Sequence, residues 1–102
     1  MNNYPADEQL DKVRSWEISL LSDPAVAALV EYVRSIWWAE DWGFKLRRGW
    51  VMRLELHTSG WSGNEDIVEA LKGNQFFWLY YWQESRRGGH YVFEFPLACF
   101  KE

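Results

Sequence analysis

The chain has 102 residues, of which 48% are hydrophobic and 25% are charged, and its formal net charge at pH 7 is −4. This length predicts a single domain over residues 1–102 with one core. The negative charge argues against general nucleic-acid binding, because neutralising a phosphate backbone needs clustered Lys and Arg. No apolar run approaches the ~18 residues that span a bilayer, and the polar start lacks a signal-peptide pattern. We therefore expect no membrane association and a cytoplasmic location.

Two helices are predicted first in the chain. Residues 6–21 carry apolar side chains at helical spacing, with acidic residues in the first turn, where the helix dipole favours them. Asp23 and Pro24 predict the start of the second helix, Asp23 as its cap and Pro24 at its first position. An apolar stripe then continues to Trp37, and Gly43 is the expected left-handed end. The two helices are expected to pack as a hairpin.

The middle of the chain changes to a period of two. Residues 50–57 alternate apolar and polar, which predicts a strand with Met52, Leu54 and Leu56 against the helices. Arg53, Glu55 and His57 are then expected on its other face. An additional short strand is predicted at residues 44–47, joined to the longer one by a turn at Arg48 and Gly49.

A third helix and a hairpin are predicted in the last part. Ser62 and Glu65 have capping-box spacing, so Ser62→Ala is expected to cost on the order of 1 kcal/mol, and the helix is expected to end near Gly73. Residues 76–83 are apolar on both faces, which favours a strand covered on both sides. A glycine turn at 86–89 leads to a last strand at 90–95, ended by Pro96.

The predicted order is therefore α-α-β-α-β-β, with the extra short strand at 44–47 as an addition. This order predicts an α+β fold in which an N-terminal helical hairpin packs on a small antiparallel sheet. The single Cys99 can form no intramolecular disulfide and is expected to be a small buried residue of the core.

Aromatic residues are unusually frequent, with eight Trp, five Tyr and six Phe. Trp is seldom wholly buried, because its indole N–H needs a partner and one edge is favoured where water remains. Some of these rings are expected to face a ligand or a partner. A small domain can also fill its few core positions with bulky rings, so either role is open for any one Trp.

The only two histidines, His57 and His90, are expected on strands of one sheet. A binding site is therefore predicted where the loop after His57 meets the turn before His90, and separation by more than ~12 Å would leave no common pocket. The alternative is that both histidines only tie loops to the sheet. The predicted site residues are His57, Trp61, Asn64, Glu65, Arg87 and His90.

Catalytic and metal chemistry are not predicted for these residues. Two histidines with Glu55, Glu65 or Asp66 would have the composition of a transition-metal triad, but no short ligand spacing is present. The serines near the histidines lack the flanking pattern of a nucleophile elbow. We therefore expect no catalytic residue, metal or cofactor.

Two turns, Arg47-Arg48-Gly49 and Arg86-Arg87-Gly88, interrupt aromatic segments. Four guanidinium groups beside aromatic rings at one sheet edge would suit a phosphate group and a stacked base. Charged turns are also ordinary solubilising features.

The segment LELHTSGWSGNEDIVEAL, followed by FFWLYYWQESRRGGHYVFEF, resembles short tailed-bacteriophage and prophage proteins that have no assigned activity. The resemblance covers residues 54–95 and implies an origin in a tailed-phage or prophage genome. Phage accessory proteins of this size more often bind host or phage proteins than catalyse reactions, so it implies a non-catalytic recognition module with an aromatic-rich surface, acting in the host cytoplasm. The alternative is a small enzyme or a nucleotide- or phosphate-binding protein that uses His57, Glu65, His90 and the arginine turns.

Overall fold

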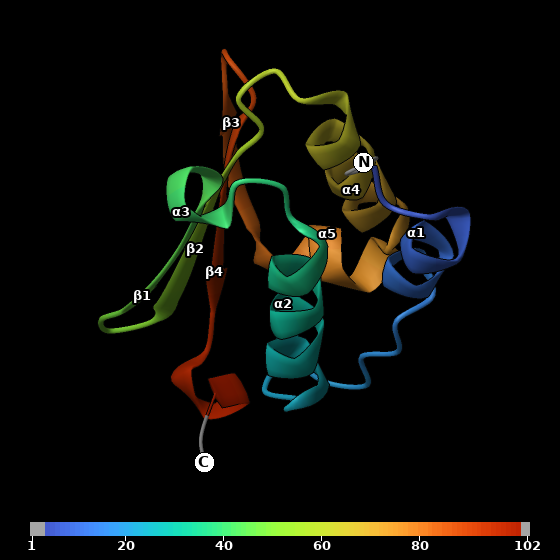
Figure 1. Ribbon diagram of the computed structural model, residues 1–102. Helices are drawn as coiled ribbons and strands as arrows, with labels where there is room; N and C mark the ends of the chain where they lie inside the picture. Colours follow the sequence, from blue (N-terminus) through green and yellow to red (C-terminus); the bar gives the residue numbers. More distant parts are fainter. Residues whose placement is uncertain (1–3, 101–102) are drawn as a thin grey trace.

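The computed structural model describes residues 4–100. Its elements are α1 (Asp7–Arg14), α2 (Ala25–Ile36), α3 (Glu40–Gly43), β1 (Phe44–Arg48), β2 (Met52–His57), α4 (Ser62–Gly73), α5 (Gln75–Tyr81), β3 (Trp82–Arg86), β4 (His90–Phe95) and a 3₁₀ helix at Leu97–Phe100. The strands form one antiparallel sheet in the order β1-β2-β4-β3. In Figure 1 the helices α1, α2, α4 and α5 lie on one side of this sheet. The predicted α+β class is confirmed.

The sheet has an inner face toward the helices and an outer face away from them. Met52, Leu54 and Leu56 are buried on the inner face, where Phe93 and Phe95 of β4 join them in the core. The predicted faces of β2 are therefore confirmed. The short strand β1 and its turn are also confirmed, but β2 begins at Met52, so Trp50 lies in the turn and is 99% exposed.

Helix α1 is shorter than predicted, because it ends at Arg14 and not at residue 21. The chain then turns, and the Trp16 indole donates to the Ala25 carbonyl at 2.9 Å. Trp16 and Lys12 lie against the Tyr32 ring of α2. The expected hairpin is nevertheless a minor contact, since α1 packs mainly on α4.

Asp23 binds the start of α2, but the cap residue is Pro24 and the helix begins at Ala25, one residue later than predicted. Its Oδ1 accepts the N–H of Ala25 at 2.9 Å and its Oδ2 accepts the N–H of Ser19 at 2.8 Å. These two hydrogen bonds lower the pKa of the Asp23 carboxyl, and the bond from the Ser19 N–H has the larger effect.

The end of this helical region differs from the prediction. Helix α2 ends at Ile36, and the left-handed residue is Ala39, with φ 58°. Gly43 has no such φ, so its predicted role is wrong. Glycine is needed there for a different reason: a Cβ at Gly43 would lie 2.2 Å from the backbone oxygen of His57. Helix α3 can therefore touch the end of β2.

The predicted capping box of α4 is wrong. The cap residue is Trp61, and Ser62 is the first helical residue with no side-chain cap hydrogen bond. The Ser62 hydroxyl instead lies 2.8 Å from the Tyr4 hydroxyl, and a Glu65 carboxylate oxygen lies 3.5 Å from Thr58 Oγ1. The helix does end at Gly73, as predicted.

Ser62→Ala is accordingly expected to lower the free energy of unfolding by about 0.5 kcal/mol or less, since it removes one exposed hydroxyl contact and no cap. Urea denaturation of the variant beside the wild type measures this. A loss near the ~1 kcal/mol of a cap would show that Ser62 caps the helix after all.

The predicted strand at residues 76–83 is wrong, because residues 75–81 form helix α5. The Asn74 side chain accepts the Phe77 N–H at 3.2 Å and so caps this helix. Phe77 and Tyr81 lie four residues apart on the same side of the helix. Their rings pack in the core against Phe95 in tilted and edge-on arrangements. An apolar run with no clear period fits either structure, and the cap decides for a helix.

The predicted turn at 86–89 and the last strand at 90–95 are confirmed, but the first strand of this hairpin is β3, at Trp82–Arg86. Gly88 and Gly89 adopt positive φ of 85° and 79° in the turn between β3 and β4, and Pro96 follows the last residue of β4. Cys99 is buried and unpaired, as expected. Within residues 4–100, no helix is long and apolar enough to cross a membrane.

Candidate functional site

The outer face of the sheet carries charged and imidazole side chains, and α3 borders it at one end. The strand register places them in rows across the sheet: His57, His90 and Arg86; then Lys45, Glu55, Val92 and Glu84; then Arg47, Arg53 and Glu94. Val92 is fully buried although it lies on this face. The aliphatic parts of the long side chains around it therefore cover it.

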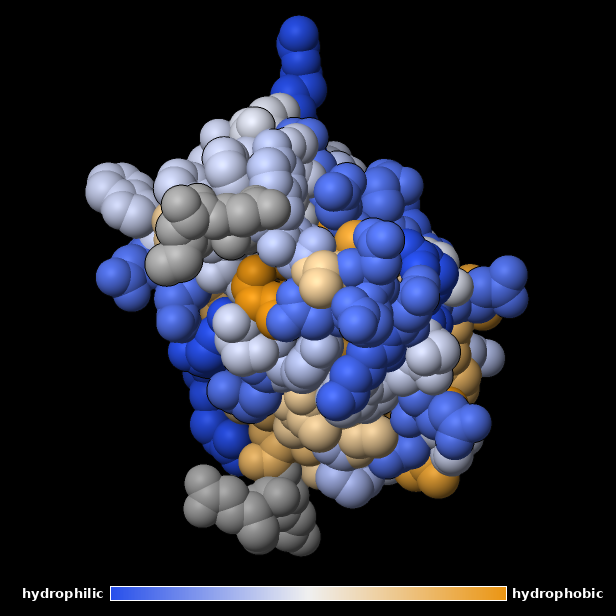
Figure 2. Space-filling view, turned by 45° about the vertical axis from the view of Figure 1, so that its right-hand side comes forward, coloured by the Kyte–Doolittle hydropathy of each residue, from blue (hydrophilic) through white to orange (hydrophobic). Residues whose placement is uncertain are grey.

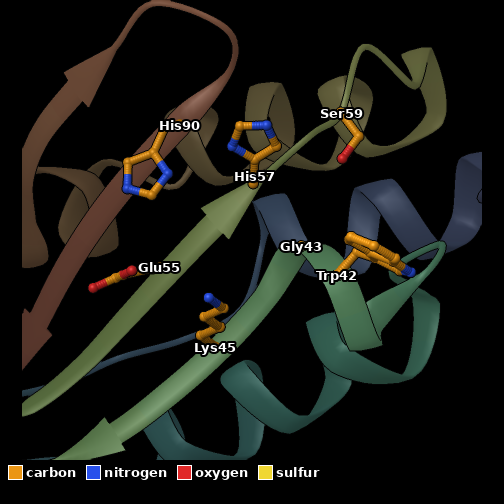
Figure 3. A pocket seen from close by; sticks show the side chains of 7 residues that line it. All are labelled: Trp42, Gly43, Lys45, Glu55, His57, Ser59 and His90. Carbon is orange, nitrogen blue, oxygen red and sulfur yellow. The ribbon is translucent and has the colours of Figure 1, made fainter.

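The two histidines face each other directly. His57 pairs with His90 across β2 and β4, and their ring centroids are 5.8 Å apart. They line a pocket of about 320 Å³ together with Trp42, Lys45, Glu55 and Ser59. Figure 3 shows these side chains around one space, with Trp42 on the side away from His90 and Glu55. We call this space the histidine pocket. The predicted convergence of the histidines is confirmed.

Backbone contacts, not the histidines, tie the loop to the sheet. The Thr58 N–H donates to the Gly89 carbonyl at 3.0 Å, and a Cβ at Gly89 would lie 2.1 Å from Thr58 Oγ1. The loop then passes Ser59, whose φ of 55° is left-handed. The imidazole rings of His57 and His90 have no hydrogen bond to any residue between 4 and 100, although their backbones pair in the sheet. Both imidazoles are therefore open to a ligand.

Arg53 holds the carboxylates of the outer face. Its Nε donates to Glu55 at 3.0 Å and its Nη1 donates to Glu94 at 2.9 Å. The hydrogen bond from Arg53 lowers the pKa of Glu55, against the opposing effect of burial. Lys45 stands opposite Glu55 on β1, yet among the described residues it forms no ion pair. The Lys45 ammonium group is thus the uncompensated charge of the pocket.

Four predicted site residues lie outside the histidine pocket. Trp61 stacks between the rings of Tyr4 and Trp38, at 5.0 Å and 4.9 Å. The buried Asn64 amide accepts the Trp38 N–H at 2.9 Å and donates to the Trp38 carbonyl at 3.0 Å. Glu65 contacts Thr58. The remaining residue, Arg87, lies in the exposed hairpin turn.

Four pocket residues are not among the predicted site residues, for different reasons. Glu55 was expected on the face of His57 but was considered only as a metal ligand, and the same period-two pattern would have put Lys45 on that face. Ser59 carries no pattern that distinguishes it from the other serines of the loop. Trp42 follows the left-handed Ala39 in a short helix that no sequence pattern marks.

A second surface is formed by the outward side of α5. At about 100° per residue, Leu79 stands opposite the buried Phe77 and Tyr81. Leu79 is 75% exposed and Tyr80 is 49% exposed. The α5 patch is defined as three consecutive residues of α5 and the first residue of β3, whose ring stacks on that of Trp78. These residues are Trp78, Leu79, Tyr80 and Trp82.

The α5 patch is not flat. The Trp78 and Trp82 rings stack at 5.9 Å, and the Lys72 amine lies 5.6 Å from the Trp78 ring centroid. Lys72, Gln75, Trp78 and Leu79 line a shallow depression of about 330 Å³. In Figure 2 this side of the molecule is mostly hydrophilic, with one hydrophobic area near the centre of the view and others toward its lower end. The exposed aromatic side chains of the α5 patch gather at one place, where the Trp78 and Trp82 rings stack.

Between residues 4 and 100, no three His, Cys, Asp or Glu side chains stand close enough to hold a metal ion. In the histidine pocket, Glu55 would be the third ligand of a triad with His57 and His90, but its carboxylate is bound to Arg53.

No family model matches the chain, and no curated protein or solved structure is similar enough to count as a match. Function is therefore inferred from the two surfaces described above.

Proposed function

We propose that the protein is a small phage-type accessory protein that acts as a non-catalytic recognition module and docks a partner protein on its α5 patch. One observation carries this proposal. Helix α5 is apolar around its whole circumference apart from Gln75, yet only Phe77 and Tyr81 are buried. A helix that is apolar all round is normally covered on all sides. The uncovered side is therefore a surface that awaits a partner.

The chemistry of the α5 patch suits protein recognition. Trp and Tyr dominate interface hot spots, because a rigid ring buries a large area and its N–H or O–H still finds a partner. Covering Leu79, which is 75% exposed, would contribute about 1–2 kcal/mol, and covering Tyr80, of which 49% is exposed, would contribute less. The Trp82 indole already donates to Ser85 at 2.9 Å, so its burial leaves no unsatisfied donor. At Trp82 a partner therefore gains hydrophobic contact without burying an unpaired polar group.

The nature of the partner follows from the resemblance to tailed-phage proteins. It supports a host or phage protein as the partner, met in the cytoplasm of the host cell. The negative net charge and the absence of a membrane-spanning helix in the described part of the chain fit such a setting.

The test compares two exposed leucines. Leu79→Asp places a charge at the centre of the α5 patch, whereas Leu20→Asp places one in the loop between α1 and α2, where Leu20 is 55% exposed. Affinity capture from host lysate, with and without phage infection, is expected to recover a partner with the wild type and with Leu20→Asp. Leu79→Asp is expected to lose at least about 90% of it, since about 1.4 kcal/mol is a factor of ten in affinity.

Equal recovery with both variants would show that the partner binds elsewhere. The same proteins are measured by light scattering, because a second copy of the chain could also cover the α5 patch. A concentration-dependent dimer that Leu79→Asp abolishes would contradict docking of a different protein.

A further inference from the structure

We propose that the histidine pocket binds a phosphate monoester carried by a planar ring, as in a nucleoside monophosphate. Lys45, His57 and His90 would hold the phosphate, and Trp42 would stack on the ring. This site is separate from the α5 patch, so the inference does not rest on the partner protein.

The charge of the pocket selects an anion. Lys45 faces a carboxylate across the strand pair, but Glu55 is turned to Arg53 at 3.0 Å. The ammonium group is left without an ion pair in the described chain, at the edge of a cavity. A charged group in that position gains most from a ligand of opposite sign. It also repels a divalent cation, the other ligand that two imidazoles attract.

The imidazoles supply the remaining donors. The His57 and His90 rings lie side by side with centroids 5.8 Å apart, and neither ring has a hydrogen bond within residues 4–100. An imidazole N–H donates to an anionic oxygen. Together with Lys45 they present donors from β1, β2 and β4 to one space (Figure 3). A phosphate monoester has three terminal oxygens to accept them.

Trp42 indicates that the part of the ligand attached to the phosphate carries a planar ring. This indole is 80% exposed at the pocket, on the side away from His90, and it has no role in the core. An exposed indole beside an anion site is a stacking platform for a base. Gly43 holds it there, because only glycine lets α3 approach the His57 carbonyl so closely. The pocket volume of about 320 Å³ falls in the range of about 300–1,000 Å³ for small-ligand sites.

The experiment uses the two histidines as reporters. The chain contains only two, so the imidazole proton signals in an NMR titration report on this pocket alone. The probes are AMP, inorganic phosphate and adenosine. AMP is expected to shift both signals with the highest affinity, phosphate to shift them more weakly, and adenosine to leave them unmoved.

Variants assign the roles. Lys45→Gln and His57→Ala are each expected to weaken AMP binding by about tenfold or more, since each removes a charged or polar contact to the phosphate. Trp42→Ala is expected to weaken AMP binding but not phosphate binding. Lys12→Gln, which removes a cation from α1, serves as the matched control and is expected to bind AMP like the wild type. Circular dichroism checks that each variant is folded.

Three results would overturn the proposal. The first is no shift of either histidine signal with AMP up to about 10 mM, far weaker than a specific site. The second is wild-type affinity in a folded Lys45→Gln variant. The third is equal affinity for AMP and phosphate, which would show that stacking of a planar ring on Trp42 contributes nothing to binding.

Discussion

Replacing Asn74 by alanine is expected to lower the free energy of unfolding by about 3 kcal/mol, because one side chain joins three parts of the fold. Its Oδ1 caps α5 through the Phe77 N–H, and its Nδ2 donates to the carbonyls of Val13 and Trp16 at 3.1 Å and 2.9 Å. Asn74 is buried, so no water replaces these bonds. Alanine would remove the cap and leave the Trp16 carbonyl without its donor.

Urea denaturation measures this loss, with Gln75→Ala as the matched control. Gln75 is the exposed neighbour and has no hydrogen bond from its side chain within the described chain, so its replacement is expected to change stability by about 0.5 kcal/mol or less. Similar midpoints for the two variants would show that Asn74 does not join α1 and α5.

Gly43→Ala is expected to destabilise the fold by about 2–3 kcal/mol and to displace Trp42 from the histidine pocket. The added Cβ would meet the His57 backbone oxygen at 2.2 Å and the Trp37 indole nitrogen at 3.0 Å. Backbone at the end of a paired strand cannot move aside without breaking the sheet, so α3 must shift instead.

Gly49→Ala is the control for this substitution. A Cβ at Gly49 would lie 3.7 Å from the Val51 carbonyl oxygen, which is an ordinary contact. Thermal denaturation is expected to separate the two variants clearly, with Gly49→Ala close to the wild type. Equal stability would refute the close approach of α3 to β2, and with it the position of Trp42.

Sequence patterns predicted a strand or helix correctly where only one face of the element is buried. The strand β2 was predicted correctly because one face is buried and the other is not, so Leu54 and Glu55 had to alternate. The segment 76–83 has apolar side chains on every side, which removes the period that distinguishes a strand from a helix. The available signal was Asn74, a cap residue directly before the run.

The candidate site was predicted in part for the same kind of reason. His57 and His90 follow from two strands and a glycine turn, which are local patterns. Asn64 has a hydroxyl- and glycine-rich neighbourhood typical of a binding loop, but its amide is bound to the backbone of Trp38, 26 residues away. Long-range contacts of this kind leave no local pattern, and neither does the position of Trp42.

The uncovered side of α5 is the feature from which the proposed function follows, and photo-crosslinking tests it most directly. A benzoylphenylalanine residue is placed at position 79 in place of Leu79, and in a second protein at position 20 in place of Leu20, both of them exposed. Irradiation in host cells, with and without phage infection, is expected to give a covalent adduct with one host or phage protein at position 79 and none at position 20. Absence of any adduct at position 79, or the same adducts at both positions, would contradict a docking surface on α5.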